Sequence, residues 1–201
     1  IFKMYANREM RFYASVGFNG AVWQALSSTT LNNHTAKYFY QESDGRGGVS
    51  ASSPNYPLTG YVIKKWNHAF DALTGTGARM MPKAYPIIRY AEMLLSYAEA
   101  MNNLTGSHTV QVGDQSYTLG RDENEIKTSF NMVRYRAGLP GLSSAQLSSK
   151  AEVQKQIERE RMVEFLWENR RFYDVRRWGM YEETEREPIR GMNPDLSLIH
   201  I

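Results

Sequence analysis

The pattern of apolar and polar residues divides the chain into a second half with helical spacing and a first half without it. Apolar residues recur every three to four positions from Pro86 to about Asn103, from Asp122 to Ala137 and from Lys150 to Trp178, as in helices that bury one face. Gly138, followed by a proline two residues later, marks the end of the second helix. We predict three helices, the first two antiparallel and the third a single helix of about 40 Å.

Short strands and loops are predicted for the first half. It is mainly extended or irregular, and apolar residues alternate from Phe12 to Phe18, which is strand spacing. The segment Gln41–Gly60 has four Gly, four Ser and two Pro, which predicts a long loop, and Gly60–His68 predicts one short strand. A small hairpin around Gly113 is expected within the helical half. The predicted fold class is therefore mainly α, with irregular loops and short strands.

The third helical segment combines many charges with large rings, as in "EFLWENRRFYDVRRWG" (Glu164–Gly179). At about 100° per residue, Arg161, Glu164, Glu168 and Arg171 fall on one stripe, with Phe and Trp residues on both sides. Acids one turn away from arginines can pair, here Arg161 with Glu164 and Glu168 with Arg171, and enclosed charges must be paired. We assign these four residues and Asp174 to a partly buried structural ionic seam.

The remaining arginines of this segment allow two other interpretations. Arg159, Arg170 and Arg177 cluster on the opposite face, where we expect solvent. A nucleic-acid surface is the first alternative, but residues 151–178 hold seven Lys/Arg against six Asp/Glu, and a phosphate-binding helix leaves positive charge uncompensated. A catalytic pair of glutamates on this helix is the second, but carboxylates of glycosidases normally flank an open cleft from separate elements.

The overall composition excludes few function classes. The net charge is only +3, with a pI near 9.0, which is too mild to require a polyanionic partner. The sequence has no cysteine, and its four histidines lack metal-ligand spacing, so we expect no metal site and no cofactor. No run approaches about 18 apolar residues, so we predict no membrane-spanning helix.

The two ends of the sequence suggest an internal piece of a longer protein. The chain begins at Ile1, and any targeting segment would precede it. Its last six residues, Leu196–Ile201, resemble a translated sequencing adapter, and we treat them as an artefact. We expect one domain over residues 1–190 and a tail over residues 191–201.

Four segments carry a resemblance to a known family. They are "REMRFYASVGFNG" (Arg8–Gly20), "PIIRYAEMLLSYAEAMNNL" (Pro86–Leu104), "FNMVRYRAGLPGL" (Phe130–Leu142) and "IERERMVEFLWENRRFYDVRRWGM" (Ile157–Met180). The last three, in this order, resemble the C-terminal signatures of the SusD/RagB family, outer-membrane nutrient-binding lipoproteins of Bacteroidetes, and the first is similar to the family's segment after its usual Asp-Pro-Arg. The first segment departs from the family's usual letters at its first four residues.

The resemblance implies a SusD-like fold with tetratricopeptide-like helix pairs, of which this chain would be the C-terminal portion. It implies a surface-exposed outer-membrane lipoprotein, held to the membrane only by an N-terminal lipid anchor that is not in this chain. The protein would bind glycans, as oligosaccharide or polysaccharide, or other oligomeric nutrients such as peptides, and deliver them to a SusC-like TonB-dependent transporter. It would be neither an enzyme nor a nucleic-acid-binding protein. Arg89, Glu92 and Glu99 become structural candidates, with Arg89 and Glu92 paired one turn apart.

The candidates for ligand binding lie outside the helices. Proteins hold sugars with flat rings against the apolar sugar face and with polar side chains around the hydroxyl groups, and loops commonly carry such groups on a rigid scaffold. We select the rings of Trp23, Tyr38, Tyr40 and Tyr56, with Asn33 as a polar partner. Each ring could instead pack beneath its own loop.

Two other functions stay open at this point. A helical-repeat scaffold could bind a partner protein without any direct glycan binding. A glycosidase would require the two glutamates of the charged helix to act on a substrate. The residues do not distinguish starch, host glycan, plant polymer and peptide as ligands.

Overall fold

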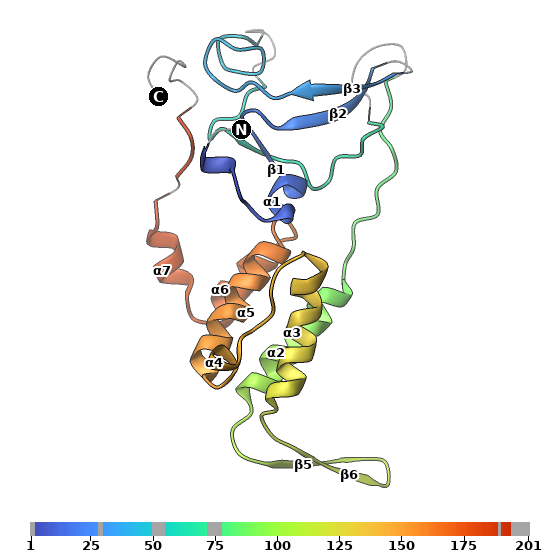
Figure 1. The fold of residues 1–201 in the computed structure, drawn as a ribbon, viewed down its shortest axis with the longest axis vertical. Helices are drawn as coiled ribbons and strands as arrows, with labels where there is room; N and C mark the ends of the chain where they lie inside the picture. The colour runs from blue at the N-terminus through green and yellow to red at the C-terminus, as the bar shows by residue number, and fades with distance from the viewer. Residues whose placement is uncertain (1–2, 28–29, 50–54, 72–77, 189, 194–201) are drawn as a thin grey trace. The chain divides into compact units, whose positions relative to one another are not determined.

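The structure is a computed structural model that describes residues 3–27, 30–49, 55–71, 78–188 and 190–193 (Figure 1). The chain forms two compact units. The N-terminal unit comprises residues 1–85 and 182–201, and the helical unit comprises residues 86–181. The segment Leu196–Ile201, predicted to be an artefact, lies outside the described residues.

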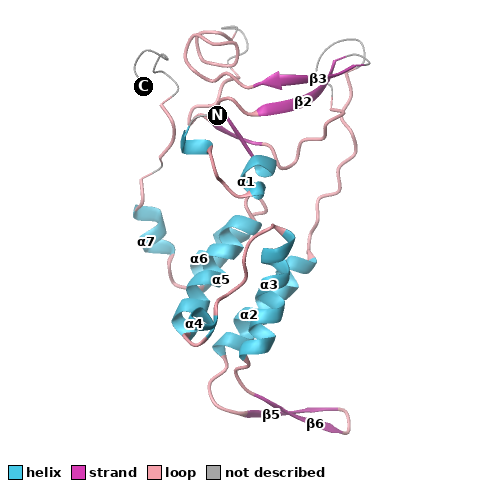
Figure 2. Ribbon diagram, viewed as in Figure 1, coloured by secondary structure: helices cyan, strands magenta, loops and turns pink. Residues whose placement is uncertain are grey.

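The helical unit consists of an antiparallel helix pair and a broken helix that packs against it (Figure 2). The pair is α2 (Tyr90–Asn103) and α3 (Glu123–Arg136), and the broken helix is α5 (Lys150–Glu164) and α6 (Arg170–Arg177). The short α4 (Ser144–Leu147) precedes α5. Helix α2 contacts both α3 and α5, so the core lies between these three helices.

The core of the helical unit is made by the apolar positions that recur along each helix. Its fully buried side chains are Leu95, Ala98, Ile126, Phe130, Val133, Val153 and Ile157. Burying a large apolar side chain contributes about 1.5–3 kcal/mol. The predicted helical pattern is thus confirmed for α2, α3 and α5.

Local capping explains where α3 and α5 begin. The Asp122 carboxylate accepts hydrogen bonds from the backbone N–H groups of Asn124 and Glu125, at 2.7 and 3.1 Å. The Ser149 hydroxyl accepts one from the N–H of Glu152 at 3.2 Å. Both residues satisfy donors that lack a partner in the first helical turn. The prediction for α3, from Asp122 to a glycine stop, is confirmed, since Gly138 has φ +71°.

Helix α2 begins four residues later than predicted. Pro86 was expected in its first turn, but the helix starts at Tyr90 and Arg89 has extended backbone angles. The backbone carbonyl of Ile87 accepts a hydrogen bond from Arg170, and the Arg89 side chain reaches two glutamates of the charged segment. Long-range contacts therefore hold these residues outside the helix.

The single helix predicted from Lys150 to Trp178 is wrong. Helix α5 ends at Glu164, residues 165–169 form a turn, and α6 begins at Arg170. Trp167 and Asn169 both have φ +59°, the left-handed region that interrupts a right-handed helix. Asn tolerates this region better than most residues, so Asn169 was the local sign of a break within the helical spacing.

The hairpin predicted around Gly113 is confirmed. Strands β5 (His108–Val112) and β6 (Gln115–Leu119) pair antiparallel between α2 and α3. Gly113 has φ +61°, which a side chain would disfavour in this tight turn. All residues of both strands are exposed.

The N-terminal unit contains two small antiparallel strand pairs. Strand β1 (Val16–Phe18) pairs with β4 (Tyr61–Ile63), and β2 (Val22–Ser27) pairs with β3 (Thr30–Thr35). The unit also contains a 3₁₀ turn (Lys3–Tyr5), α1 (Met10–Ser15) and most of α7 (Tyr181–Arg186). The short strand predicted between Gly60 and His68 is confirmed as β4.

The predicted strand from Phe12 to Phe18 is only partly right. The chain is helical up to Ser15 and extended from Val16. The helical turn brings the Phe12 and Tyr13 rings to centroid distances of 5.1 and 6.1 Å from Phe18, next to the buried Tyr5. Aromatic clustering thus overrides the alternating pattern.

The loop predicted from Gln41 to Gly60 is confirmed for its described residues, 41–49 and 55–60, which contain no helix or strand. A Cβ at Gly45 would lie 1.8 Å from the backbone oxygen of Phe39, so only glycine fits there. Met192 donates its backbone N–H to Thr59 at 3.0 Å, so part of the predicted tail packs on this loop. No helix in the described part of the chain is long and apolar enough to span a membrane.

The break between α5 and α6 can be tested at Asn169. Asn169→Gly is expected to keep or slightly raise the free energy of unfolding, because glycine adopts positive φ without strain. Asn169→Val is expected to lower it by about 1–2 kcal/mol, because a β-branched residue is strained at that φ. Urea denaturation of both variants measures the difference. Equal stability of the two variants would contradict the left-handed turn.

Candidate functional site

A hollow lined by rings lies on the N-terminal unit. Its volume is about 520 Å³. We call it the aromatic hollow, and it is lined by Trp23, His34, Ala36, Tyr38, Asp44, Asn55, Tyr56, Pro57 and Val62. Three of the four rings proposed as ligand contacts, Trp23, Tyr38 and Tyr56, thus meet around one space although strands and loops separate them in sequence.

Close backbone packing positions the Trp23 ring. A Cβ at Gly17 would lie 2.3 Å from Cζ2 of Trp23 and 2.6 Å from Cγ2 of Val62. Trp23 on β2 is therefore able to lie against β1 only because position 17 has no side chain. The ring is half-buried, which leaves part of it available to a ligand.

A short polar network positions the loop that carries Tyr38. The Asp44 carboxylate lies 2.8 Å from Nε2 of His34 and accepts the backbone N–H of Lys37 at 2.8 Å. The buried Asn19 side chain accepts the N–H of Tyr38 at 2.7 Å. Burial, followed by the charge of Asp44, raises the pKa of Tyr38 to about 12, while a hydrogen bond with Trp23 acts in the opposite direction. The Tyr38 hydroxyl consequently keeps its proton at neutral pH.

A second hollow shares the Trp23 wall. Its volume is about 460 Å³. We call it the lysine hollow, and it is lined by Ala14, Val22, Trp23, Asn33, Lys64, Lys65, Asn67, His68 and Ala69. The predicted contact Asn33 lies here and not beside the tyrosines. Tyr40 lines neither hollow, because its ring lies against Gly47.

The helical unit holds a separate ionic network. We use this name for Arg89, Glu99, Arg161, Glu164, Glu168, Asp174 and Arg177. Arg89 makes a bidentate contact to Glu168 through Nε and Nη2, both at 2.8 Å, and contacts Glu164 through Nη1 at 2.8 Å. Only 3% of the Glu164 side chain and 6% of the Glu168 side chain are exposed. The planar guanidinium can satisfy both buried carboxylates at once.

The centre of the ionic network is a buried bidentate pair. Arg161 contacts the two oxygens of Asp174 through Nε at 2.9 Å and Nη2 at 3.1 Å. Its third nitrogen, Nη1, donates to Ser96 of α2 at 3.2 Å. The Phe165 ring lies 5.1 Å from the guanidinium of Arg89 and 5.2 Å from that of Arg161, and only 5% of the Arg161 side chain and 4% of the Asp174 side chain are exposed.

Arg177 joins the far end of the ionic network to α2. It contacts Asp174 through Nε at 2.9 Å and both carboxylate oxygens of Glu99, with Nη2 at 2.7 Å. The indole N–H of Trp178 donates to the same carboxylate at 2.7 Å. Burial alone raises the pKa of Glu99, but the hydrogen bonds from Arg177 and Trp178 outweigh it and leave the pKa below its ordinary value.

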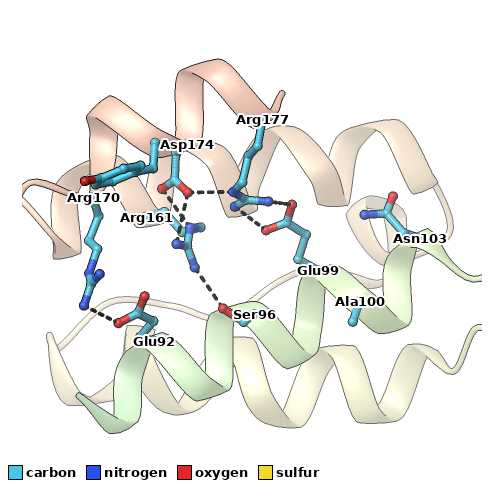
Figure 3. Close-up of a pocket in the computed structure, with 10 residues that line it drawn as sticks. Glu92, Ser96, Glu99, Ala100, Asn103, Arg161, Arg170, Asp174 and Arg177 are labelled. Atoms are coloured by element: carbon cyan, nitrogen blue, oxygen red, sulfur yellow. Dashed lines mark hydrogen bonds and ion pairs between the residues drawn. The ribbon is translucent and has the colours of Figure 1, made fainter. Parts of the chain in front are cut away.

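One face of the ionic network is open to a third hollow (Figure 3). This charged hollow has a volume of about 480 Å³. It is lined by Glu92, Ser96, Glu99, Ala100, Asn103, Arg161, Arg170, Tyr173, Asp174 and Arg177. Its three acids and three arginines pair with one another, including Arg170 with Glu92 at 2.9 Å. The hollow therefore has no uncompensated charge to attract an ion.

Comparison with known proteins places this arrangement in a family. The sequence model described as the SusD family matches residues 1–196. The chain belongs to the SusD family.

Solved structures agree with this assignment. A SusD-like protein (BF3747) from Bacteroides fragilis NCTC 9343 is 30% identical with a TM-score of 0.65, over 90% of this chain and 30% of that protein. A protein named BT4246 is 25% identical with a TM-score of 0.64, over 91% of this chain and 28% of its own. No curated protein sequence matches the chain. The chain thus spans less than a third of the length of these solved relatives. The fold class predicted from the sequence, mainly α with helix pairs and short strands, is confirmed.

The SusD-family chain pairs its charges differently from the prediction. The expected pairs of Arg161 with Glu164 and of Arg89 with Glu92 are wrong, because each arginine reaches across to another element. Arg171 is half-buried and pairs with none of the described acidic residues. Helical periodicity identifies only neighbours on the same helix, so it could not find partners supplied by tertiary packing.

Sequence reasoning also missed two members of this region. Arg170 and Arg177 were expected to face solvent, but the break before α6 rotates them onto Glu92 and Glu99. The signal available was the acidic pair on α2, which is spaced so that both carboxylates face one side of that helix. Among the described residues, no group of three histidines, aspartates or glutamates is placed to hold a metal ion.

Removal of one buried acid tests the ionic network. Glu168→Ala is expected to lower the free energy of unfolding by about 3 kcal/mol, because it leaves part of the Arg89 guanidinium buried without its partner. Arg136→Ala is the matched control. Its side chain is 57% exposed although it also contacts Glu164, so it should cost at most about 1 kcal/mol. Thermal and urea denaturation measure both, and similar small losses for the two variants would argue against a buried network.

Acidification tests the Glu99 pair. A carboxylate with a lowered pKa stabilises the fold above its unfolded pKa, and this contribution disappears as the pH falls through the folded pKa. We expect Glu99→Gln to be less stable than the parent near neutral pH, and the difference to shrink below the ordinary value of 4.5. Urea denaturation across this pH range measures it. A difference that does not change with pH would contradict an ionised Glu99.

Proposed function

We propose that this SusD-family chain binds oligosaccharides in the aromatic hollow. The observation that carries the proposal is the meeting of Trp23, Tyr38 and Tyr56 around one space of about 520 Å³. Aromatic rings pack against the apolar C–H face of a sugar, and the volume is within the ordinary range of ligand sites, about 300–1,000 Å³. His34, Asp44 and other polar groups at the rim supply hydrogen-bond partners for hydroxyl groups.

We further infer that the chain acts as a binding protein and not as an enzyme. The only carboxylates that the sequence offered as a catalytic pair, Glu164 and Glu168, are buried and both bind Arg89. A general acid must lie within hydrogen-bond reach of the leaving group, and both carboxylates are instead buried against the Arg89 guanidinium. The ionic network is better suited to holding α2 against α5 and α6, which we propose as its role.

Delivery to a transporter is the second part of the proposal. Family membership supports a surface-exposed outer-membrane lipoprotein that passes its ligand to a SusC-like TonB-dependent transporter. The membrane attachment would come from an N-terminal lipid anchor. Nucleic-acid binding is not part of this proposal, because the described arginines of the ionic network already bind carboxylates.

A scaffold that binds only proteins is the competing function. It would use the exposed rings of the helical unit, such as Tyr90 and Tyr97, and would leave the aromatic hollow empty. Binding of purified chain to a panel of oligosaccharides separates the two functions, because a scaffold of this kind has no sugar affinity.

Substitution of one ring tests the hollow. Trp23→Ala is expected to weaken oligosaccharide binding about tenfold or more, since it removes a large flat contact surface worth about 1.4 kcal/mol or more. Trp66→Ala is the matched control, because Trp66 belongs to the same unit and lies against Tyr85 at a centroid distance of 5.2 Å. Titration calorimetry with an oligosaccharide that binds the parent measures both.

The two variants show whether Trp23 belongs to the oligosaccharide site. Loss of affinity in Trp23→Ala with normal affinity in Trp66→Ala supports the aromatic hollow. Unchanged affinity in Trp23→Ala, with circular dichroism equal to that of the parent, would remove Trp23 from the site and the proposal with it.

A further inference from the structure

The lysine hollow contains lysine side chains, which the described lining of the aromatic hollow does not. Lys64 follows β4 directly, and its backbone N–H binds the carbonyl of Ser15 at 2.9 Å. Its ammonium group donates to the backbone carbonyls of Tyr13 at 3.1 Å and Val22 at 3.2 Å. The ammonium is thus held at a defined place and not free to swing into solvent.

The partners of Lys64 are dipoles and not charges. Carbonyl groups orient an ammonium but do not neutralise it, and one of its three N–H donors has no partner among these contacts. Among the described residues that line the lysine hollow there is no aspartate or glutamate. A fixed and uncompensated cation beside an open space attracts an anionic group.

The surrounding charges reinforce this attraction. The N-terminal unit has a formal charge of +2, because residues 182–201 contain two arginines against five acids, and residues 1–85 contain nine lysines and arginines against four aspartates and glutamates. Three of these four acids are already paired, Glu9 with Arg11, Asp44 with His34 and Asp71 with Lys83.

Trp23 connects the two hollows of the N-terminal unit. It lines both of them, and the ammonium of Lys64 lies 5.8 Å from the centroid of its ring. A sugar ring packed against Trp23 can therefore place a substituent near Lys64. The amides of Asn33 and Asn67 line the same space and can serve the neighbouring hydroxyl groups.

We propose that the ligand is an acidic oligosaccharide, whose carboxylate or sulfate group binds Lys64 in the lysine hollow. This inference rests on the proposed function and narrows its ligand class. A purely structural role for Lys64, as a tie between the Tyr13 and Val22 carbonyls, makes a different prediction. It would change stability without changing the preference between acidic and neutral ligands.

The test compares matched pairs of oligosaccharides. One arm uses uronic-acid oligomers and the same oligomers after carboxyl reduction, and the other uses sulfated oligosaccharides and their desulfated forms. We expect at least one acidic member to bind about tenfold more tightly than its neutral counterpart at low salt, as for a charge-assisted hydrogen bond. Added salt should weaken the acidic member and leave the neutral one unchanged.

Three variants test whether Lys64 causes the tighter binding of the acidic oligosaccharide. Lys64→Gln is expected to reduce it to about threefold or less while the neutral member binds as before, which also verifies the fold. Lys64→Arg should restore it because the charge is kept. Lys37→Gln is the control, since it removes one exposed positive charge from the same unit and lines neither hollow.

Each outcome supports or overturns either the acidic-ligand inference or the proposed glycan binding. Equal binding of acidic and neutral members, or a preference that persists in Lys64→Gln, overturns the inference while the proposed glycan binding stands. Failure of every oligosaccharide to bind the parent overturns both. A preference for uronates alone or for sulfates alone supports the inference and identifies the anionic group.

Discussion

The buried pair of Arg161 and Asp174 is the contact on which the helical unit depends. Thirteen residues separate the two along the chain, and in a continuous helix they would lie about 20 Å apart. A bidentate contact at 2.9 and 3.1 Å therefore requires the chain to fold back between them. The turn at residues 165–169 achieves this through two residues at positive φ. The strain of that turn, about 1–2 kcal/mol for each residue, is offset by satisfying buried charges that would otherwise be costly.

The same turn organises the other charges of the segment. It places Phe165 between two guanidinium groups and leaves both glutamates of the turn region facing Arg89. It also directs Arg177 onto Glu99 of α2. Each arginine thus joins two elements, and the charged hollow beside them is electrically balanced (Figure 3). The density of charges and rings in this segment is explained by internal pairing.

The N-terminal unit has the opposite character. Its hollows are formed by loops and short strands, Trp23 and Tyr56 are partly exposed while Tyr38 is buried, and the ammonium of Lys64 donates to two backbone carbonyls. A surface of this kind suits a ligand that combines an apolar sugar face with hydroxyl groups and an anion. In the charged hollow of the helical unit each arginine is paired with an acid, whereas Lys64 of the N-terminal unit donates to carbonyl groups. An anionic ligand can therefore gain more free energy beside Lys64.

The choice of Trp23, Tyr38 and Tyr56 as ligand contacts stays a prediction. The sequence by itself determined the family, the helices of the second half and the hairpin around Gly113, because spacing, caps and turn residues act over a few positions. It could not show that Tyr40 lies apart from these rings, that the last helix breaks or which acid binds each arginine. Those features depend on contacts between residues far apart in the chain. Only the tertiary structure decided them, because desolvation and ion pairing act between residues that are close in space. A charged side chain that packing buries must pair with a charged group that the same packing places next to it.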